Sequence, residues 1–396
     1  MSNDVVVAGV GMTPFLKPSA KTPYTVLGAA AVRDALTDAG LDYRDVGQAY
    51  VGYCYGDTTS GQRALYEVGM STVPIFNVNN ACSTGSSALF LARQAVASGV
   101  TDCALALGFE QMAPGALDTV WQDRPGPLDR FVDVIEDLQG PSNAPLAIRL
   151  FGAAGVEYAE RHGTSPRAFA EIASKARRHA AFNERAIFRD PVTPEQVLES
   201  PPMYGLLTRL QCCPPTCGAA AAIVCSRDFA LRHGLPVRVT IRAQACQTDS
   251  PATFGNRSAI SCIGYEMARD TARAVYEAAG IGPGDVDVVE LHDCFTVNEL
   301  LTYESIGLCA EGGAEKFISD GDNTYGGRIV TNPSGGLLSK GHPLGATGLA
   351  QCAELNWQLR GECGPRQVED ARLALQHNLG LGGACVITMY ERASQC

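Results

Sequence analysis

The sequence predicts an α/β protein made of layered strands and helices in two related halves. Near both ends of the chain, short runs of β-branched or small apolar residues alternate with longer helical patterns, which is typical of α/β layers. Each half also places a strand, a loop and a helix around its densest group of reactive side chains. A chain of 396 residues is long enough for two or three compact units and a large buried core.

The first half is predicted to alternate strands with helices over residues 1–110. Strands are expected where short apolar runs occur, at residues 4–10, 48–54, 75–78 and 102–108. Helices are expected at 26–39 and 86–98, and in the second of these Leu89, Ala92 and Val96 recur at helical spacing.

The pattern breaks near residue 111 and returns near residue 211. The intervening segment carries much charge and several prolines, with helical stretches around 144–162 and 166–183. Strands are again expected at 218–225 and 237–245. We therefore predict an N-terminal half (1–110 and 211–250), an inserted loop domain (111–210) and a C-terminal half (251–396).

The C-terminal half is predicted to repeat the alternation of strands and helices seen in the first half. Helices are expected at residues 268–279, 295–306 and 345–359, and strands at 286–292, 373–377 and 384–390. No sequence repeat of short period accompanies this similarity, so the likeness between the halves is one of topology.

Composition excludes several classes of protein. Hydrophobic residues make up 46% and charged residues 18%, which are ordinary values for a globular chain rather than a disordered or collagen-like one. The net charge of −11 disfavours general binding to nucleic acid or to anionic membranes. No apolar run approaches the roughly 20 residues that span a bilayer. We expect no nucleic-acid partner and no membrane partner.

Fifteen cysteines are the unusual feature of the composition. An odd count in a long chain, with no charged and then apolar leader at the start, favours free thiols in a reducing compartment. The final tripeptide, Ser394-Gln395-Cys396, is not the peroxisomal S-K-L signal. We therefore expect a cytoplasmic protein in which most thiols are buried packing residues.

The first reactive motif is Asn79-Asn80-Ala81-Cys82-Ser83-Thr84-Gly85, between a short strand and an amphipathic helix. The N–H groups at a helix N-terminus lower the pKa of a nearby thiol and favour a reactive thiolate. The structural alternative is a buried cysteine at a tight turn.

The second motif, His292-Asp293-Cys294-Phe295, follows a hydrophobic strand and precedes a helix. Ligands of α/β proteins gather at the C-terminal ends of strands, where such polar runs are costly unless used. Asp293 as a helix N-cap would account for Asp293 alone.

Two glycine-rich segments complete the set. Asn332–Gly336 and Lys340–Gly348 place His342 between glycines and a proline ahead of a helix, which favours a general base or an oxyanion donor. His377–Gly383 reads as a tight turn between strands, or as a loop that offers a backbone N–H to an oxyanion.

Two further clusters of residues are weaker candidates for a functional site. Cys212, Cys213, Cys217 and Cys225 lie close in sequence but lack zinc-site spacing, so we expect no metal. The basic run at residues 175–179 is typical of a solvated helix face, with a phosphate anchor as the alternative.

Together these segments resemble the thiolase superfamily, and more narrowly its sterol-carrier-protein-2 (SCP2) type. The likeness runs over nearly the whole chain and is carried by residues 77–80, 292–295, 321–327, 340–348 and 376–383. It implies the thiolase fold, in which two α/β halves pack as five layers (α-β-α-β-α) with an inserted loop domain.

The resemblance implies a role for each reactive residue. Cys82 corresponds to the nucleophile that becomes acylated, and His342 to the histidine that activates it. Ordinary thiolases have a second catalytic cysteine in a C-x-G loop, which here reads Asn378-Leu379-Gly380. In the SCP2 type the acid/base is the cysteine of H-D-C-F, which is Cys294.

The resemblance also implies two oxyanion holes. His292 takes the place of an asparagine that lines one hole in ordinary thiolases. The backbone N–H groups of Cys82 and Gly380 form the other. Cys217 stands where thiolases usually have aspartate, so the polar network at that point is expected to differ.

The implied function is cleavage of 3-oxoacyl-CoA by CoA, giving acetyl-CoA or propionyl-CoA and a shortened acyl-CoA. Branched and sterol-side-chain substrates are typical of the SCP2 type. CoA is a co-substrate, no cofactor is expected, and the implied assembly is a homodimer or a dimer of dimers. The alternatives are a C–C lyase such as a steroid side-chain retro-aldolase, an acyltransferase subunit that needs a partner protein, and a non-catalytic lipid binder.

Overall fold

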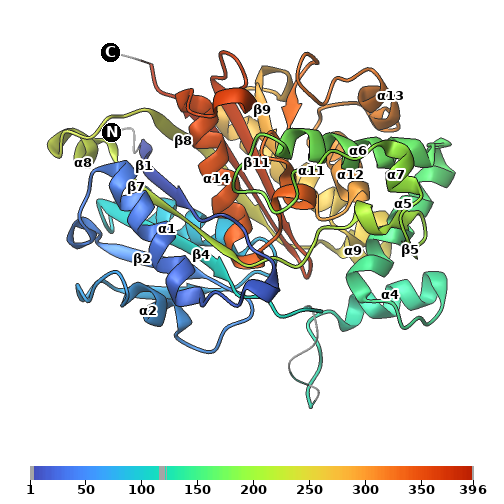
Figure 1. The fold of residues 1–396 in the computed structure, drawn as a ribbon, viewed down its shortest axis with the longest axis horizontal. Coiled ribbons are helices and arrows are strands. Elements are labelled where there is room, and N and C mark those ends of the chain that lie inside the picture. Colours follow the sequence, from blue (N-terminus) through green and yellow to red (C-terminus); the bar gives the residue numbers. More distant parts are fainter. Residues whose placement is uncertain (1–3, 116–120, 122, 395–396) are drawn as a thin grey trace.

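A computed structural model describes residues 4–115, 121 and 123–394 of the chain. A ten-stranded sheet forms the centre of the molecule (Figure 1). Of the C-terminal tripeptide considered above, Gln395 and Cys396 lie outside the described residues. The strands are hydrogen-bonded in the order β10-β9-β11-β12-β8-β1-β7-β4-β2-β3.

The sheet consists of two groups of five strands, and the strand Val239–Gln247, which was expected in the N-terminal half, lies in the second group. The first group is β1 (Val5–Met12), β2 (Gln48–Gly52), β3 (Ile75–Val78), β4 (Cys103–Glu110) and β7 (Gly218–Ser226). The second is β8 (Val239–Gln247), β9 (Val288–Glu290), β10 (Val330–Thr331), β11 (Leu373–Gly380) and β12 (Ala384–Arg392). The groups meet where Val5 and Val6 of β1 pair with Ile241 and Thr240 of β8.

Helices cover both faces of each strand group. On β1, Val5 and Val7 face a core shared with α3 (Thr84–Ala97) and α14 (Leu344–Arg360), while Val6 faces α1 (Tyr24–Ala39). On the far side of the second group, α11 (Tyr265–Ala279) and α12 (Thr296–Ser305) cover β11 and β12. Since α3 and α14 share one core with strands of both groups, they lie between the groups, and the predicted five-layer arrangement is confirmed.

The two central helices approach to backbone contact. A Cβ added at Gly348 of α14 would lie 2.4 Å from the backbone nitrogen of Ser86 in α3, and one at Gly85 would lie 2.6 Å from the carbonyl oxygen of Gly345. Glycine is therefore required at both positions, because any side chain would push the helices apart. This crossing brings together the loops that precede α3 and α14.

The segment between β4 and β7 packs mainly on the C-terminal half, at the green end of the view in Figure 1. It holds α4 (Asp129–Gln139), α5 (Leu146–His162), α6 (Pro166–Ala180), α7 (Pro194–Leu198), β5 (Pro202–Tyr204) and β6 (Leu207–Thr208). Both helices expected there are present as α5 and α6. The three-part domain division stays a prediction.

Only part of the basic run on α6 is solvated, because Arg178 is exposed whereas Lys175 and His179 are buried. Lys175 is buried and its ammonium group pairs with the buried carboxylate of Glu299 on α12. His179 is also buried, with Nδ1 3.0 Å from the carbonyl oxygen of Asn332 and Nε2 2.7 Å from the hydroxyl of Thr324. The solvated-face interpretation therefore holds for Arg178 but is wrong for Lys175 and His179, which point inward and tie the inserted segment to the C-terminal half.

Several short elements were not predicted from the sequence. They include α2 (Ser60–Leu65), α8 (Arg227–Arg232), α9 (Pro251–Gly255), α10 (Ala259–Cys262) and α13 (Ala314–Ser319), and also α4, α7, β5, β6 and β10. The segment expected as a turn at 377–383 is divided, because β11 continues to Gly380 and the turn is confined to the residues before β12. No helix in the described ranges is both long and apolar enough to cross a bilayer.

Candidate active site

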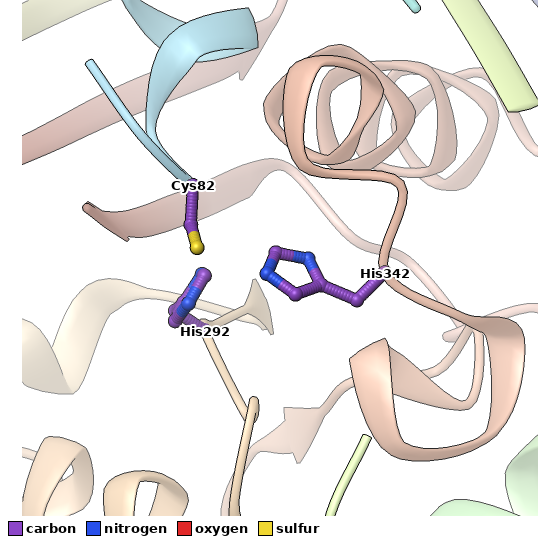
Figure 2. A group of neighbouring side chains, drawn as sticks. All are labelled: Cys82, His292 and His342. Atoms are coloured by element: carbon purple, nitrogen blue, oxygen red, sulfur yellow. The ribbon is translucent and has the colours of Figure 1, made fainter. Parts of the chain in front are cut away.

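Cys82 lies at a strained turn between β3 and α3. Ala81 has a φ of 48°, in the left-handed region that non-glycine residues seldom adopt. The Thr84 hydroxyl holds this turn, since it accepts a hydrogen bond from the backbone N–H of Asn80 at 2.8 Å and donates one to the carbonyl oxygen of Ala81 at 2.6 Å. The thiol is half-buried and points away from the helix, towards the rings of His292 and His342 (Figure 2).

His342 lies at the start of α14, across from the thiol. Its backbone N–H donates to the Thr216 hydroxyl at 3.2 Å, and its ring Nδ1 lies 2.7 Å from the Thr347 hydroxyl. The Thr347 hydroxyl donates its own hydrogen to the carbonyl oxygen of Pro343 at 2.9 Å, so it accepts from Nδ1–H of His342. The other nitrogen, Nε2, is therefore a lone-pair acceptor, and it is buried without a hydrogen-bond partner.

His292 follows β9 and lies against His342. The two rings meet edge to face, with centroids 5.1 Å apart and planes at 83°. Burial lowers the pKa of His292 well below its ordinary value, and the neighbouring His342 and His377 lower it further. Burial alone lowers the pKa of His342 to about 3. Both imidazoles are therefore neutral at physiological pH.

The thiol and the two imidazoles converge on one point (Figure 2). One ligand-capable atom from each of Cys82, His292 and His342 lies within 4.8 Å of the other two. One thiolate and two imidazoles are a donor set that zinc accepts. In the described part of the chain no such group forms from Cys212, Cys213, Cys217 and Cys225.

The resting Cys82 thiol differs from the sequence expectation. Burial raises its pKa to about 12, and the nearby carboxylate of Glu110 adds to the rise, although the backbone N–H groups of Cys82 and Leu381 oppose it. The expected lowering at the helix N-terminus is thus outweighed by desolvation and a negative neighbour. A protonated thiol needs a base, and His342 presents a free lone pair beside it.

Cys294 is buried one residue before the N-cap of α12. Its carbonyl oxygen accepts a hydrogen bond from the backbone N–H of Cys213 at 2.9 Å, and Cys212 forms an antiparallel bridge with Phe295. Burial raises the pKa of Cys294 well above its ordinary value, with Cys213 and Cys82 as additional causes. Cys213 is a third thiol beside this group, and sequence reasoning did not single it out for that role.

The C-terminal end of β11 packs directly on the nucleophile turn. A Cβ at Gly380 would lie 2.3 Å from the carbonyl oxygen of Asn80 and 2.7 Å from the hydroxyl of Ser83. Glycine is needed for this approach, which places backbone N–H groups of both segments near the thiol. The assignment of the Cys82 and Gly380 N–H groups to an oxyanion hole stays a prediction.

Two neighbouring residues have structural roles. Asp293 does not cap α12, whose N-cap is Phe295; its carboxylate accepts from the backbone N–H groups of Leu337 and Leu338 at 2.7 and 3.2 Å. It thereby caps the turn η5 (Gly336–Lys340) that leads to His342. Cys217 is buried in the apolar core beside β1, as a small packing residue.

Glu110 is a buried residue that sequence reasoning missed. Its carboxylate accepts hydrogen bonds from the backbone N–H groups of Cys54, Tyr55 and Gly345, at 2.9 to 3.0 Å. It therefore links the end of β4 to the start of α14. An acidic residue at the end of an otherwise apolar strand was the available signal.

Comparison with protein families matches both halves of the chain. Residues 5–202 match the model described as "Thiolase, N-terminal domain", and residues 255–389 match "Thiolase C-terminal domain-like". A curated relative, "Sterol carrier protein 2" of Rattus norvegicus, is 53% identical over 391 residues, covering 98% of this chain and 72% of that protein.

Two solved structures share the fold over nearly their whole length. The chain matches an "Ltp2-ChsH2(DUF35) aldolase" with a TM-score of 0.84 and 23% identity, covering 100% of this chain and 99% of that one. It matches human mitochondrial 3-ketoacyl-CoA thiolase in complex with CoA with a TM-score of 0.73 and 19% identity, covering 99% and 98%. At these identities the likeness shows the thiolase fold, as predicted from the sequence.

Proposed function

The chain belongs to the thiolase family, which gives it a thiolase-type function on acyl-CoA, and we propose that it is an SCP2-type 3-oxoacyl-CoA thiolase. The reaction is cleavage of a 3-oxoacyl-CoA by CoA into acetyl-CoA or propionyl-CoA and a shortened acyl-CoA. The observation that supports it most directly is the convergence of Cys82, His342 and His292 within 4.8 Å, with neutral imidazoles beside a protonated thiol.

In the first half-reaction, Cys82 attacks the 3-keto carbon while Nε2 of His342 takes the thiol proton. The oxyanion that forms on the keto oxygen is proposed to be stabilised by the backbone N–H groups of Cys82 and Gly380, and the thioester oxygen of the departing enolate by His292. The bond between C2 and C3 then breaks. The C2 enolate leaves and takes a proton from the thiol of Cys294, while the shortened acyl group remains on Cys82 as a thioester.

In the second half-reaction, CoA releases the acyl group. The Cys294 thiolate takes the proton of the CoA thiol, and the resulting thiolate attacks the acyl-Cys82 carbonyl carbon. The backbone N–H groups of Cys82 and Gly380 are proposed to stabilise this second oxyanion. The thioester bond to Cys82 breaks, and Cys82 regains its proton from His342, so that both cysteines return to their starting state. CoA is the only co-reactant that this route requires.

The proposed substrates include 2-methyl-branched and sterol-side-chain 3-oxoacyl-CoA. The 53% identity to a sterol carrier protein 2 supports this class. The fourteen described cysteines are unpaired, which suits a reducing compartment such as the cytoplasm.

A homodimer is part of the proposal. β3 is an edge strand of the sheet, and Phe76 on it is 47% exposed. Phe76, Tyr50 and residues of α3 line an open groove of about 670 Å³ beside that edge. An exposed edge strand with apolar side chains is a surface that a second copy covers readily.

Thiolysis tests the proposed function. The purified protein should cleave acetoacetyl-CoA and a 2-methyl-3-oxoacyl-CoA in the presence of CoA, followed by loss of the enolate absorbance. Cys82→Ala should abolish cleavage, and the acyl group should be found on Cys82 of the wild type by mass spectrometry. Lack of CoA-dependent cleavage of both substrates by the folded wild type would refute the proposal.

A further inference from the structure

A buried chain of hydrogen bonds leads from Tyr390 on β12 to His292 behind the nucleophile. The Tyr390 hydroxyl donates to Oε1 of Gln376 at 2.5 Å, and Nε2 of Gln376 donates to the Ser86 hydroxyl at 2.8 Å. The Ser86 hydroxyl donates to Oδ1 of Asn378 at 2.7 Å, and Nδ2 of Asn378 lies 3.0 Å from Nδ1 of His292. All five side chains are buried.

The direction of this chain is fixed by two backbone carbonyl groups. The carbonyl oxygen of Gly348 accepts from Nε2 of Gln376 at 2.6 Å, and that of Cys82 accepts from Nδ2 of Asn378 at 3.2 Å. A carbonyl oxygen only accepts, so each amide must present its NH₂ group there. Reversal of Asn378 would also place its oxygen against the oxygen of Cys82 and its NH₂ group against the Ser86 hydroxyl.

Asn378 therefore donates its second amide hydrogen to Nδ1 of His292. A neutral imidazole carries one proton, and a ring nitrogen that accepts a hydrogen bond does not hold it. We infer that Asn378 is a positioning residue that holds His292 as the Nε2–H tautomer, an oxyanion donor rather than a base. Its consequence for catalysis rests on the proposed thiolase function, whereas the tautomer itself rests on the hydrogen bonds alone.

The two histidines then have opposite proton placements. His342 carries its proton on Nδ1 and offers a lone pair at Nε2, while His292 carries its proton on Nε2. With Nδ1 accepting from Asn378, the His292 ring has no free lone pair. The arrangement therefore gives the reaction one base, His342, and one hydrogen-bond donor, His292. Because the His292 ring has no free lone pair, it cannot act as the third ligand of a metal ion at the group of Cys82, His292 and His342.

The tautomer is measured directly by NMR of the full-length protein labelled with ¹⁵N-histidine. The His292 resonances, assigned by their loss in His292→Gln, should show a protonated Nε2 and an unprotonated, hydrogen-bonded Nδ1. A proton on Nδ1 would overturn the inference. The experiment uses no substrate, so it gives an answer even if the protein fails to cleave oxoacyl-CoA.

Asn378→Asp tests the same assignment by replacing a hydrogen-bond donor with an acceptor. A carboxylate at this position accepts instead of donating, so it should draw the His292 proton to Nδ1 and leave a lone pair at Nε2. We expect kcat for thiolysis to fall by about 10²–10³-fold with little change in KM, because an oxyanion donor is lost. We also expect Zn²⁺ affinity, measured by calorimetry, to rise on the order of 10–100-fold, because a carboxylate–histidine–zinc arrangement is completed.

Two control variants separate this effect from added charge or general disruption. Asn79→Asp introduces the same charge three residues from Cys82, where the Asn79 oxygen already accepts from the backbone N–H of Ala81 at 3.0 Å, and it should leave Zn²⁺ affinity within about twofold of wild type. Asn378→Asp combined with Cys82→Ala should lose the gained affinity. Equal Zn²⁺ affinity in Asn378→Asp and wild type would contradict the inference, and if Asn378→Asp does not fold, the wild-type spectrum still decides.

Discussion

The ring of His292 meets the ring of His342 edge to face, at a centroid distance of 5.1 Å. Both rings are buried, and no carboxylate is bonded to a ring nitrogen of either histidine in the described contacts. Two imidazolium ions at this separation would repel each other, so the pair is neutral at rest. The site therefore starts from a thiol and a neutral base rather than from a thiolate–imidazolium pair.

Alkylation of the resting enzyme tests this protonation state. Because the pKa of Cys82 is raised to about 12, its thiolate fraction is small at neutral pH and grows as pH rises. The rate of iodoacetamide labelling at Cys82, followed by mass spectrometry, should rise about tenfold per pH unit between about pH 7 and 9. Cys82→Ala gives the background from other thiols. A rate that is already level below pH 7 would indicate an ion pair instead.

Cys294→Ala should separate acyl transfer from proton transfer. Transfer of an acetyl group from acetyl-CoA to Cys82 needs no proton at C2, so the variant should still form acetyl-Cys82. Exchange of the C2 hydrogens of acetyl-CoA with deuterated water should fall by about 10²–10⁴-fold, because the acid/base is lost.

Cys213→Ala is the matched control for that variant. The backbone N–H of Cys213 donates a hydrogen bond to the carbonyl oxygen of Cys294, and the substitution retains this N–H group. Exchange in this variant should stay within a few-fold of wild type. Undiminished exchange in Cys294→Ala, or loss of exchange in Cys213→Ala, would place the acid/base on another group.

His179→Gln should flatten the dependence of stability on pH. Burial, with Lys175 as a second cause, lowers the pKa of His179 to about 3, below its value of about 6.5 in an unfolded chain. The unfolded state therefore binds the proton first, and stability is lost as pH falls from 6.5 towards 3. His179 therefore contributes up to about 1.4 kcal/mol per pH unit to the pH dependence of the free energy of unfolding.

Glutamine can donate and accept as His179 does but does not titrate. The free energy of unfolding, measured with denaturant at several pH values, should fall less steeply with decreasing pH in His179→Gln than in wild type. The difference in slope should correspond to one bound proton. His233→Gln changes an exposed histidine and should keep the wild-type slope. Equal slopes in all three proteins would show that His179 is not held neutral in the fold.

Phe76→Arg should separate the two subunits of the proposed dimer. The substitution places a charge on the exposed apolar edge beside β3, where a second copy is expected to pack. Sedimentation should give the mass of two chains or a multiple for wild type and of one chain for the variant. Val26→Arg changes another exposed apolar residue, on α1, and should retain the wild-type mass. A monomeric wild type would contradict this part of the proposal.

The sequence by itself determined the layered α/β class and the order of the main elements, which follow from hydrophobic periodicity, a local property of the chain. Short motifs indicated four candidate reactive side chains, Cys82, His292, Cys294 and His342, and the family resemblance gave each its predicted role. Lys175 and His179 show the limit of such reasoning, because helical spacing does not tell which polar face of α6 another element covers.

Only the tertiary structure decided how the reactive groups are protonated and held. Asn378 is bonded to Ser86, which lies 292 residues away in sequence, and Glu110 is bonded to Gly345, 235 residues away. The pKa of Cys82 likewise depends on burial and on Glu110, not on its own motif. Desolvation and hydrogen-bond direction arise from groups that meet only when the two halves of the fold pack together, so no local pattern specifies them.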